Sequence, residues 1–597
     1  MRHGTTKGTP HVLRLLGAGV LIAAIVSAIG ATGAGSAPST PKPKFTEATA
    51  FDVSKPLSEL VRAAPKGETD LDEDDAQVPE GAGPGKAHEA DAAVQSTAPA
   101  AAIAAPLANF EGLANADNKT VFGGYVNPPD LSGDVGPNHY VEMLNVVFAV
   151  YSKTGTLLLG PALIGSLWNG FAVPECTDQS GDPIVLYDQT TDRWILSQFT
   201  TRGLPAQNLQ IYNCVAVSTT GDPTGTYYRY AFPTQPDTVH GGFFFPDYPK
   251  YGVWSNSYVL TTRDFGSDPV NSEYGISVYA LEKNKMVNGE ANARAVQFFL
   301  DSRDVPLAQI GDGLLPPDLD GNRRPQPTDS PAPIVGTQDD NGPYGATSDA
   351  LNIYDLTVHW RSTPTASLTG PTQLAVAAFD SNYPCAGPAP RFVSRDCLPQ
   401  PGITNTAQYL DILSYRQRPT YRLAYRNFGT YEALVTNQSV NAGTEASPQA
   451  GVRWYEIRRT DGTYSLYQQG TFAPNDGVHR WMGSAAMDKN GDIAAGYSVV
   501  NGTNVYPGIR YTGRLAGDPL GQMTLGEGTI ATGAGVQTTL NSRWGDYTSL
   551  NIDPTDDCSF WYVNEYYQRS GVPLPAPVTA DTRPWQTRIA SFKLPGC

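Results

Sequence analysis

The sequence predicts an all-β protein and, within that class, a β-propeller of about seven blades. Gly (60) and Pro (49) are abundant and Tyr (31) outnumbers Phe (20), a composition typical of turn-rich β proteins. A strand–turn–strand unit recurs along the chain, and seven clusters of strand-like sequence follow one another. Repeated β units of this size indicate a propeller or another radial array.

The clearest repeat is a strand that opens with Arg-Trp, an Asp-x-x-x-Asp turn and a second strand. One copy spans 542–563 and another spans 479–500, while a looser copy lies at 181–196. In the copy at 542–563 the second strand is aromatic and β-branched, which suits a pleated, half-buried surface. We therefore interpret the copies as equivalent parts of different blades.

The seven clusters span residues 132–155, 182–230, 245–279, 332–379, 421–462, 479–500 and 542–563. Seven units in residues 107–597 give roughly 70 residues each, which is longer than the about 40–45 of a WD40 blade. We assign the excess to inserted loops at 301–332 and 383–407. Six or eight blades remain alternatives, and a β-sandwich is the rival fold.

The N-terminal region predicts export. Residues 1–37 combine basic residues, an apolar run and small residues near a cleavage site, as signal peptides do. The alternative, an uncleaved membrane anchor, conflicts with an apolar run shorter than roughly 20 residues. Residues 38–106 are rich in Ala and Pro with an acidic cluster, which predicts a disordered linker or pro-segment.

The signal peptide predicts an extracellular protein with no membrane insertion after cleavage, and we expect it to be a monomer. The net charge of -17, with no offsetting basic stripe, argues against nucleic acid as a partner. Six cysteines and no Cys-x-x-Cys pair favour disulfides over zinc. Six cysteines allow 15 pairings. By proximity we predict Cys176–Cys214, Cys385–Cys397 and Cys558–Cys597.

Several clusters open with a small residue followed by an acid. Because the innermost strands of a propeller all start at one end of its channel, these acids would ring one mouth: Asp134, Asp182, Asp247 and Asp546. They are the candidate catalytic residues, since a glycosidase needs one carboxylic acid and one carboxylate. The alternative is that they cap loops through backbone N–H groups.

Other side chains near these acids could bind a substrate. Arginines could clamp a carboxylate, aromatic rings could stack on sugars, and a His/Tyr pair could serve β-elimination. The candidates are Arg263, Arg480, Arg543, Tyr248, Tyr547, Trp481, Trp544, His139 and His240. In the alternative, Arg-Trp-Gly-Asp is a structural unit with Arg paired to Asp between blades.

A structural calcium ion is a further hypothesis. Asp318, Asp320 and Asn322 place side-chain oxygens at alternate positions, as calcium loops do. The run lacks the glycine and closing glutamate of an EF-hand at the right offsets. A solvated turn is the alternative.

The acidic turns at 188–192, 488–492 and 553–557 resemble the Asp-box hairpins of sialidase-like propellers, without the full Ser-x-Asp-x-Gly-x-Thr-Trp pattern. The chain over 120–597 also resembles a group of exported bacterial proteins. The shared sequence lies at 451–456, 479–484, 511–514, 543–547 and 560–566. This resemblance implies an exported propeller and supplies no catalytic residues.

Two functions follow as hypotheses. The first is a secreted, sialidase-like propeller that recognises an extracellular glycan or a cell-surface protein through its channel face. The second is a glycoside hydrolase or polysaccharide lyase acting on an extracellular acidic polysaccharide. Asp and Arg clustered at one mouth in an open pocket would favour the enzyme, and arginines buried in ion pairs between blades would favour the binding module.

Overall fold

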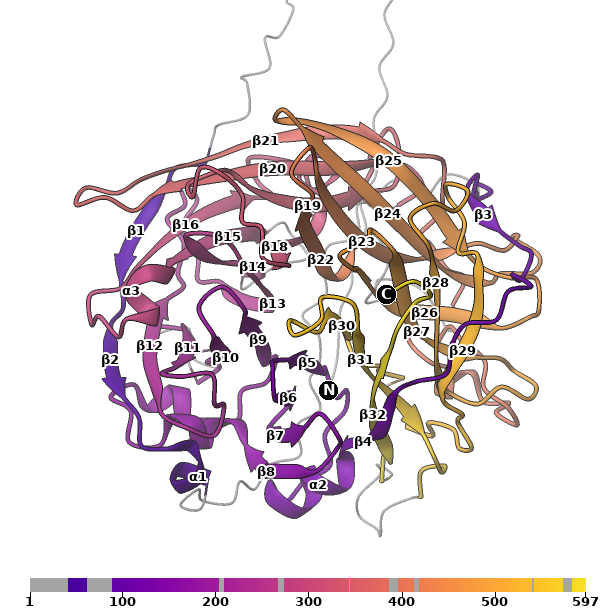
Figure 1. Ribbon diagram of the computed structural model, residues 1–597, viewed down its shortest axis with the longest axis horizontal. Helices are drawn as coiled ribbons and strands as arrows, with labels where there is room; N and C mark the ends of the chain where they lie inside the picture. The colour runs from indigo at the N-terminus through magenta and orange to yellow at the C-terminus, as the bar shows by residue number, and fades with distance from the viewer. Residues whose placement is uncertain are drawn as a thin grey trace, which may run out of the picture. The chain divides into compact units, whose positions relative to one another are not determined.

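The structure is a computed structural model that describes residues 41–61, 88–202, 204, 209–266, 273–342, 344–385, 396–412, 418–539, 542–572 and 582–597. Its residues form seven β-sheets arranged around a common centre (Figure 1). The predicted all-β propeller class is confirmed. The predicted signal peptide, residues 1–37, lies outside the described residues.

We number the sheets as blades 1 to 7 in the order in which they follow around the centre. Blade 1 consists of β5 (Ser132–Val135), β6 (His139–Leu144), β7 (Val147–Ser152) and β8 (Leu157–Leu163). Blade 2 consists of β9 (Ile184–Asp188), β10 (Arg193–Phe199), β11 (Tyr212–Ser218), β12 (Tyr227–Pro233) and β2 (Ala50–Val53). Blade 3 consists of β13 (Phe245–Val253), β14 (Ser257–Phe265), β15 (Tyr274–Glu282), β16 (Arg294–Asp301) and β1 (Lys44–Glu47).

Blade 4 consists of β17 (Asp312–Leu315), β19 (Ala332–Gln338), β20 (Ala350–His359) and β21 (Thr365–Ala375). Blade 5 consists of β18 (Pro317–Asp320), β22 (Thr420–Asn427), β23 (Glu432–Asn441), β24 (Ala450–Thr460), β25 (Thr463–Phe472) and β3 (Val94–Gln95). Blade 6 consists of β26 (His479–Met487), β27 (Ile493–Val500), β28 (Gly508–Arg514) and β29 (Leu525–Ala531). Blade 7 consists of β30 (Ser549–Ile552), β31 (Phe560–Tyr567), β32 (Trp585–Phe592) and β4 (Ala108–Ala114).

Each predicted cluster thus contributes to one sheet. The predicted insertion at 301–332 is not a plain loop, because it carries the inner strands β17 and β18. The helical segments are short and lie between strands. They are α1 (Leu57–Leu60), α2 (Asn115–Val121), η2 (Ile164–Trp168), η3 (Pro174–Thr177), α3 (Lys283–Val287), α4 (Leu307–Ile310) and η5 (Thr406–Gln408).

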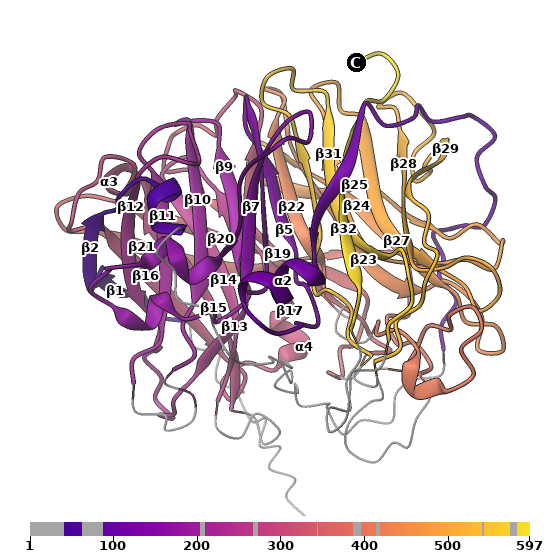
Figure 2. The same cartoon turned by 90° about the horizontal axis from the view of Figure 1, so that it is seen from below.

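The innermost strands form a closed ring. In order around the centre, β5 contacts β9, β9 contacts β13, and β13 contacts β18. Further round, β22 contacts β26, β26 contacts β30, and β30 returns to β5. Seen from the side, the strands of the blades run between two faces (Figure 2). Side chains just before the inner strands therefore meet at one face, and those just after them meet at the other.

Blade 7 joins the beginning and the end of the propeller. Its outer strand β4 pairs antiparallel with β32, with Phe110 opposite Ile589, and the two strands lie side by side in Figure 1. Opening the ring at this blade would expose a row of unpaired backbone groups on each strand, which costs free energy.

Part of the region predicted as disordered, 38–106, is ordered. Strands β1, β2 and β3 lie within it and extend the outer edges of blades 3, 2 and 5, while 38–40 and 62–87 lie outside the described residues. Phe51 packs against Tyr230 with ring centroids 5.0 Å apart, and Asp52 binds Arg229 through two hydrogen bonds. Average composition concealed these short segments, whose partners lie far along the chain.

Aromatic side chains pack between neighbouring blades. Trp481 of blade 6 and Trp544 of blade 7 lie with ring centroids 5.2 Å apart, and neither is exposed. Tyr140 of blade 1 stacks on Trp561 of blade 7 at 5.5 Å. Burial of such large apolar surfaces between blades is a main source of stability in this fold.

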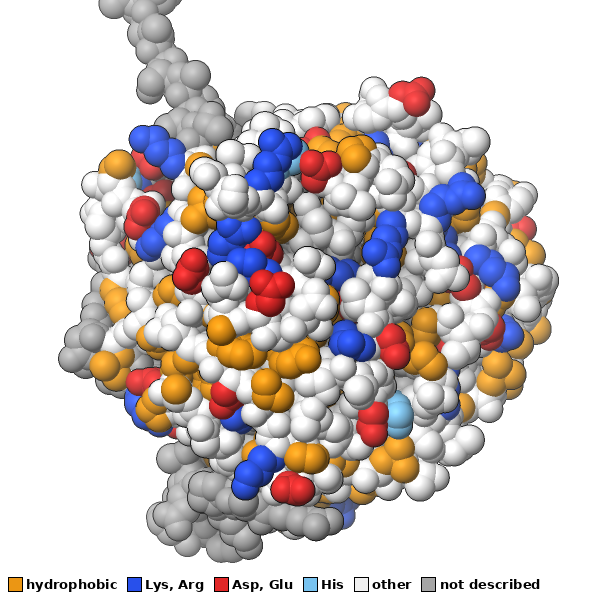
Figure 3. All heavy atoms as spheres, turned by 60° about the vertical axis from the view of Figure 1, so that its left-hand side comes forward, with side chains coloured by type: hydrophobic (Ala, Val, Ile, Leu, Met, Phe, Trp, Pro, Cys, Tyr) orange, Lys and Arg blue, Asp and Glu red, His pale blue; other side chains and the backbone are white. Residues whose placement is uncertain are grey.

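All three predicted disulfides are present: Cys176–Cys214, Cys385–Cys397 and Cys558–Cys597. Within the described ranges, no helix is long and apolar enough to cross a membrane. On the face shown in Figure 3, acidic and basic side chains are interspersed.

Candidate functional site

The structure places three of the four predicted acids at the start of inner strands. Asp182 precedes β9, Asp247 lies near the start of β13, and Asp546 precedes β30. Asp134 lies instead near the far end of β5, where it accepts hydrogen bonds from the backbone N–H groups of Val135 and Tyr187. Its assignment to the ring was wrong.

The position in blade 1 belongs to Asp130, which precedes β5. It follows Pro129, as Asp247 follows Pro246, so the same small-residue-and-acid pattern could have identified it. We call the set Asp130, Asp182, Asp247 and Asp546 the acid ring. Asp130 and Asp182 have φ values of 40° and 45°, and the neighbouring Tyr248 has 54°. Such strained backbone conformations cluster at functional sites.

Three members of the acid ring, Asp130, Asp182 and Asp546, act electrostatically on a buried lysine that the sequence analysis did not identify. The Nζ atom of Lys250 lies 3.4 Å from the ring centroid of Tyr248 and 3.8 Å from that of Tyr547, and it donates to the carbonyl of Pro249 at 3.0 Å. Burial lowers the pKa of Lys250 to about 7, although the charges of Asp182 and Asp546 oppose this shift. Its charge therefore changes near neutral pH.

Asp130 and Asp546 lie close together in different electrostatic environments. Asp130 accepts hydrogen bonds from the backbone N–H of Asp546 at 2.6 Å and from the amide of Asn145 at 2.7 Å. Burial and repulsion by Asp546 raise the pKa of Asp130 to about 7. Asp546 accepts a hydrogen bond from Arg543 at 2.9 Å and lies 3.8 Å from Arg418, so its negative charge is compensated.

A second carboxyl group supports the loop that carries Asp546. The buried Glu565 of β31 accepts a hydrogen bond from the backbone N–H of Gly545 at 2.6 Å. Burial raises the pKa of Glu565 well above its usual range. A Cβ atom on Gly545 would lie 3.2 Å from this carboxylate, so glycine lets the loop approach it closely. The hydrogen bond to Glu565 thus holds the loop that carries Asp546 in place.

The exposed fractions show which groups border the solvent. Asp182 and Asp546 keep 5% and 7% of their surfaces exposed, whereas Lys250 is fully buried and Asp130 is 1% exposed. Asp247 is only partly buried, so within the acid ring a ligand would meet Asp247 first, and Asp182 and Asp546 behind it. Tyr248 and Tyr547, predicted to stack on sugars, are buried around Lys250.

The other predicted binding residues are engaged in the fold. Arg263 pairs with Asp312 in blade 4 and contacts Tyr274. Arg480 is unexposed and pairs with Asp476 and Glu527, within its own blade and not between blades. Trp481 and Trp544 are buried between blades, so these two tryptophans and Arg480 were wrongly assigned to substrate binding.

The histidines are not part of the acid ring. His139, at the start of β6, has a pKa lowered by partial burial, and His240 lies 2.9 Å from Asp304 in an exposed pair. Across the described part of the chain, no hydrogen bond or ion pair joins either histidine to the acid ring. The predicted His/Tyr pair for β-elimination is therefore not assembled there.

The predicted calcium ligands do not fit a calcium ion. The guanidinium of Arg422 binds Asp318 and Asp320, each at 2.9 Å. The guanidinium of Arg422 thus supplies the positive charge that a calcium ion would supply. Asn322 lines a separate pocket, which Asp320 also borders. We assign Asp318 and Asp320 to a structural ion-pair network at the face where the inner strands end.

No family model matches the chain, and no curated protein matches it. Among solved structures, the chain is similar to an α-L-arabinanase of Penicillium chrysogenum complexed with arabinobiose. Their identity is 11%, with 72% of this chain and 96% of that chain covered and a TM-score of 0.30. It is also similar to an α-L-arabinofuranosidase of Fusarium graminearum with arabinobiose, at 10% identity, 68% and 92% coverage and a TM-score of 0.25.

A family 117 glycoside hydrolase of the marine bacterium Zobellia galactanivorans shares 8% identity, covers 69% of this chain and 82% of its own, and gives a TM-score of 0.24. At such values, residues of one chain cannot be matched to residues of another. Fold and site together define a β-propeller with carboxyl groups gathered around a buried lysine at one end of its inner strands.

Proposed function

We propose that the protein is a glycoside hydrolase that acts at the acid ring. The observation that carries this proposal is that carboxyl groups of different blades come together at one mouth: Asp130 accepts a hydrogen bond from the backbone N–H of Asp546, and Asp182 accepts one from the backbone N–H of Tyr248, whose ring lies beside Lys250. Glycoside hydrolysis needs two carboxyl groups held in different protonation states. The acid ring offers an ion-paired carboxylate, Asp546, and further carboxyl groups nearby.

In this proposal, Asp546 is the ionised carboxylate that acts as nucleophile or activates water, because Arg543 and Arg418 stabilise its charge. Asp182 is the second carboxyl group at the solvent edge, and it protonates the leaving oxygen. Asp130 and Lys250 lie behind them and position them. The three disulfides agree with work outside the cell, where disulfides persist.

Purified full-length protein incubated with a panel of neutral and acidic polysaccharides tests the proposal. We expect new reducing ends with the wild type and a loss of at least about a hundredfold in Asp546→Asn and in Asp182→Asn, since each removes a group used in the transition state. Asp461→Asn is the matched control, because Asp461 is exposed on a turn in blade 5.

Other results would exclude hydrolysis. Unsaturated products would identify a lyase. Retained glycan binding without turnover on any polymer would leave the binding module, which is favoured by one observation: carboxylates such as Asp182 already accept hydrogen bonds from backbone N–H groups of a neighbouring blade.

A further inference from the structure

A separate open pocket lies at the opposite face, where the inner strands end. Its volume is about 290 Å³, and it is bordered by the segment after β18, the end of β22, and the turns after β26 and β30. It therefore joins blades 5, 6 and 7. We call it the Arg323 pocket, after the exposed arginine on its wall.

Positive charge is in excess in the Arg323 pocket. Its lining includes Arg323, Arg426 and Lys489 against Asp320 and Asp557. Both acids are already paired: Asp557 binds both terminal nitrogens of Arg426, and Asp320 binds Arg422.

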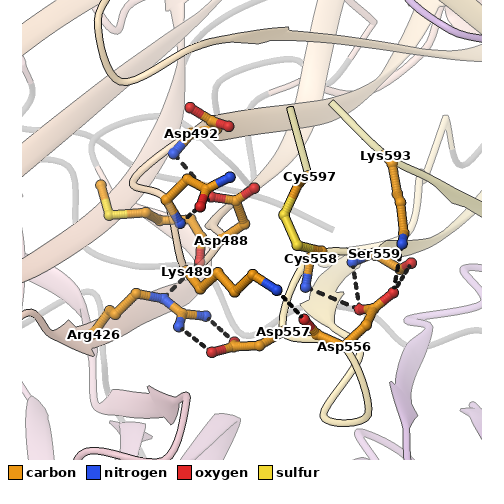
Figure 4. The surroundings of a disulfide bond; sticks show 12 residues. Arg426, Asp488, Lys489, Asp492, Asp556, Asp557, Cys558, Ser559, Lys593 and Cys597 are labelled. Atoms are coloured by element: carbon orange, nitrogen blue, oxygen red, sulfur yellow. Dashed lines mark hydrogen bonds and ion pairs between the residues drawn. A yellow bond between two sulfur atoms is a disulfide. The ribbon is translucent and has the colours of Figure 1, made fainter. Parts of the chain in front are cut away.

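The two remaining cations are available to a ligand. Among the residues that the structure describes, the ammonium group of Lys489 donates only to the backbone carbonyl of Asp556, at 2.9 Å (Figure 4). For Arg323, none of the residues that the structure describes offers a hydrogen bond or an ion pair to its side chain. A cationic pocket on a chain of net charge -17 selects for anions.

Aromatic rings continue from this pocket along blade 5. Phe428 lines the pocket and stacks on Tyr431, with ring centroids 5.0 Å apart. The guanidinium of Arg458 lies over Tyr431 at 4.1 Å and over Tyr467 at 3.2 Å, and Tyr467 is 37% exposed. Flat rings held by a guanidinium form a rigid surface that suits the apolar face of a sugar.

We propose that the Arg323 pocket binds the carboxylate of a uronic-acid residue in an acidic saccharide. Arg323 and Lys489 pair with the carboxylate, and the sugar ring packs on Phe428, which Tyr431 supports from behind. An anion alone would not need the aromatic surface, and a neutral sugar would not need the excess cations. The pocket lies at the opposite face from the acid ring, so binding here is independent of the proposed hydrolysis.

Calorimetric titration of the full-length protein with oligogalacturonate, oligomannuronate and the methyl ester of oligogalacturonate tests this proposal. We expect both acidic saccharides to bind, the methyl ester to bind at least about tenfold more weakly, and added NaCl to weaken binding. Arg323→Gln and Lys489→Gln should each reduce affinity about tenfold or more. Arg361→Gln, which changes an exposed arginine in blade 4, should have no effect.

Three results would overturn the proposal: equal affinity for the ester, binding of inorganic sulfate as tight as that of the saccharide, or no binding of either acidic saccharide. Asp546→Asn separates the two sites. This variant should bind as the wild type does even where turnover is lost. A protein that hydrolyses no polysaccharide could therefore still bind uronic acids in the Arg323 pocket. A protein that binds none there could still be a hydrolase.

Discussion

The carboxylate of Asp130 accepts a hydrogen bond from the backbone N–H of Asp546 at 2.6 Å, although 416 residues separate them in the chain. This bond links the first blade to the last at the mouth where the acid ring lies. It couples ring closure to the position of the proposed catalytic carboxylate, so a change at one residue should affect the other.

Stability should fall as pH rises from about 4 to about 7. Asp130, Glu142 and Asp264 each have a pKa raised to about 7 by burial, so the folded chain holds protons that the unfolded chain releases over this range. Thermal unfolding at pH 5 and pH 8 measures the effect. Asp130→Asn should show a smaller drop than the wild type, and equal drops would contradict the assignment.

Lys250→Met should change the pH dependence of stability in the alkaline range, above about pH 7. Because the pKa of Lys250 is lowered from 10.5 to about 7, the unfolded chain binds a proton that the folded chain lacks between these values, and wild-type stability gains from rising pH there. The Met variant should lack this gain when urea midpoints at pH 7 and pH 9.5 are compared. An identical gain in both proteins would show that burial does not lower the pKa of Lys250 in the folded state.

Trp544→Ala should destabilise the protein by about 3–5 kcal/mol, because it leaves a cavity beside Trp481 and Tyr567. Urea unfolding measures this loss. Tyr467→Ala, which changes a ring that is 37% exposed and lies outside the Arg323 pocket, should cost less than about 0.5 kcal/mol. If Trp544→Ala kept full stability but lost saccharide binding, the indole ring of Trp544 would contact the ligand instead of stabilising the fold.

Removal of the disulfide Cys558–Cys597 should cost roughly 2–4 kcal/mol of unfolding free energy. It closes a sequence separation of 39 residues, whereas Cys385–Cys397 closes 12. The chain-entropy model then predicts a loss about 1 kcal/mol larger for the first pair. Double Cys→Ala variants of each pair, compared by denaturant unfolding, check the order, and a reversed order would show that native-state contacts dominate.

Local patterns in the sequence predicted the blades well. The Arg-Trp repeats and their turns each lie within one blade, and each cysteine pair joins residues that are at most 39 positions apart in the sequence. Alternation of residue types and proximity in sequence are short-range signals. They therefore identified the strands, turns and disulfides that residues close in sequence form.

The site depends on long-range packing, which local patterns do not contain. No feature around Lys250 indicates that Tyr547, from another blade, will cover it. Arg422, which binds Asp318 and Asp320, lies more than a hundred residues further along the chain. Asp134 and Asp130 occur four residues apart in similar sequence, and only the bounds of β5 show which of them faces the acid ring.

The four N-terminal strands have consequences for how the chain folds. β2, β1, β3 and β4 pair with β12, β16, β25 and β32, respectively, and the last of these ends at Phe592. β4 therefore cannot complete its sheet until β32, the last strand of the described chain, has been made. Such distant pairings slow folding. Blade 7 is thus incomplete until almost the whole chain is present, so the ring of blades can close only at the end of synthesis.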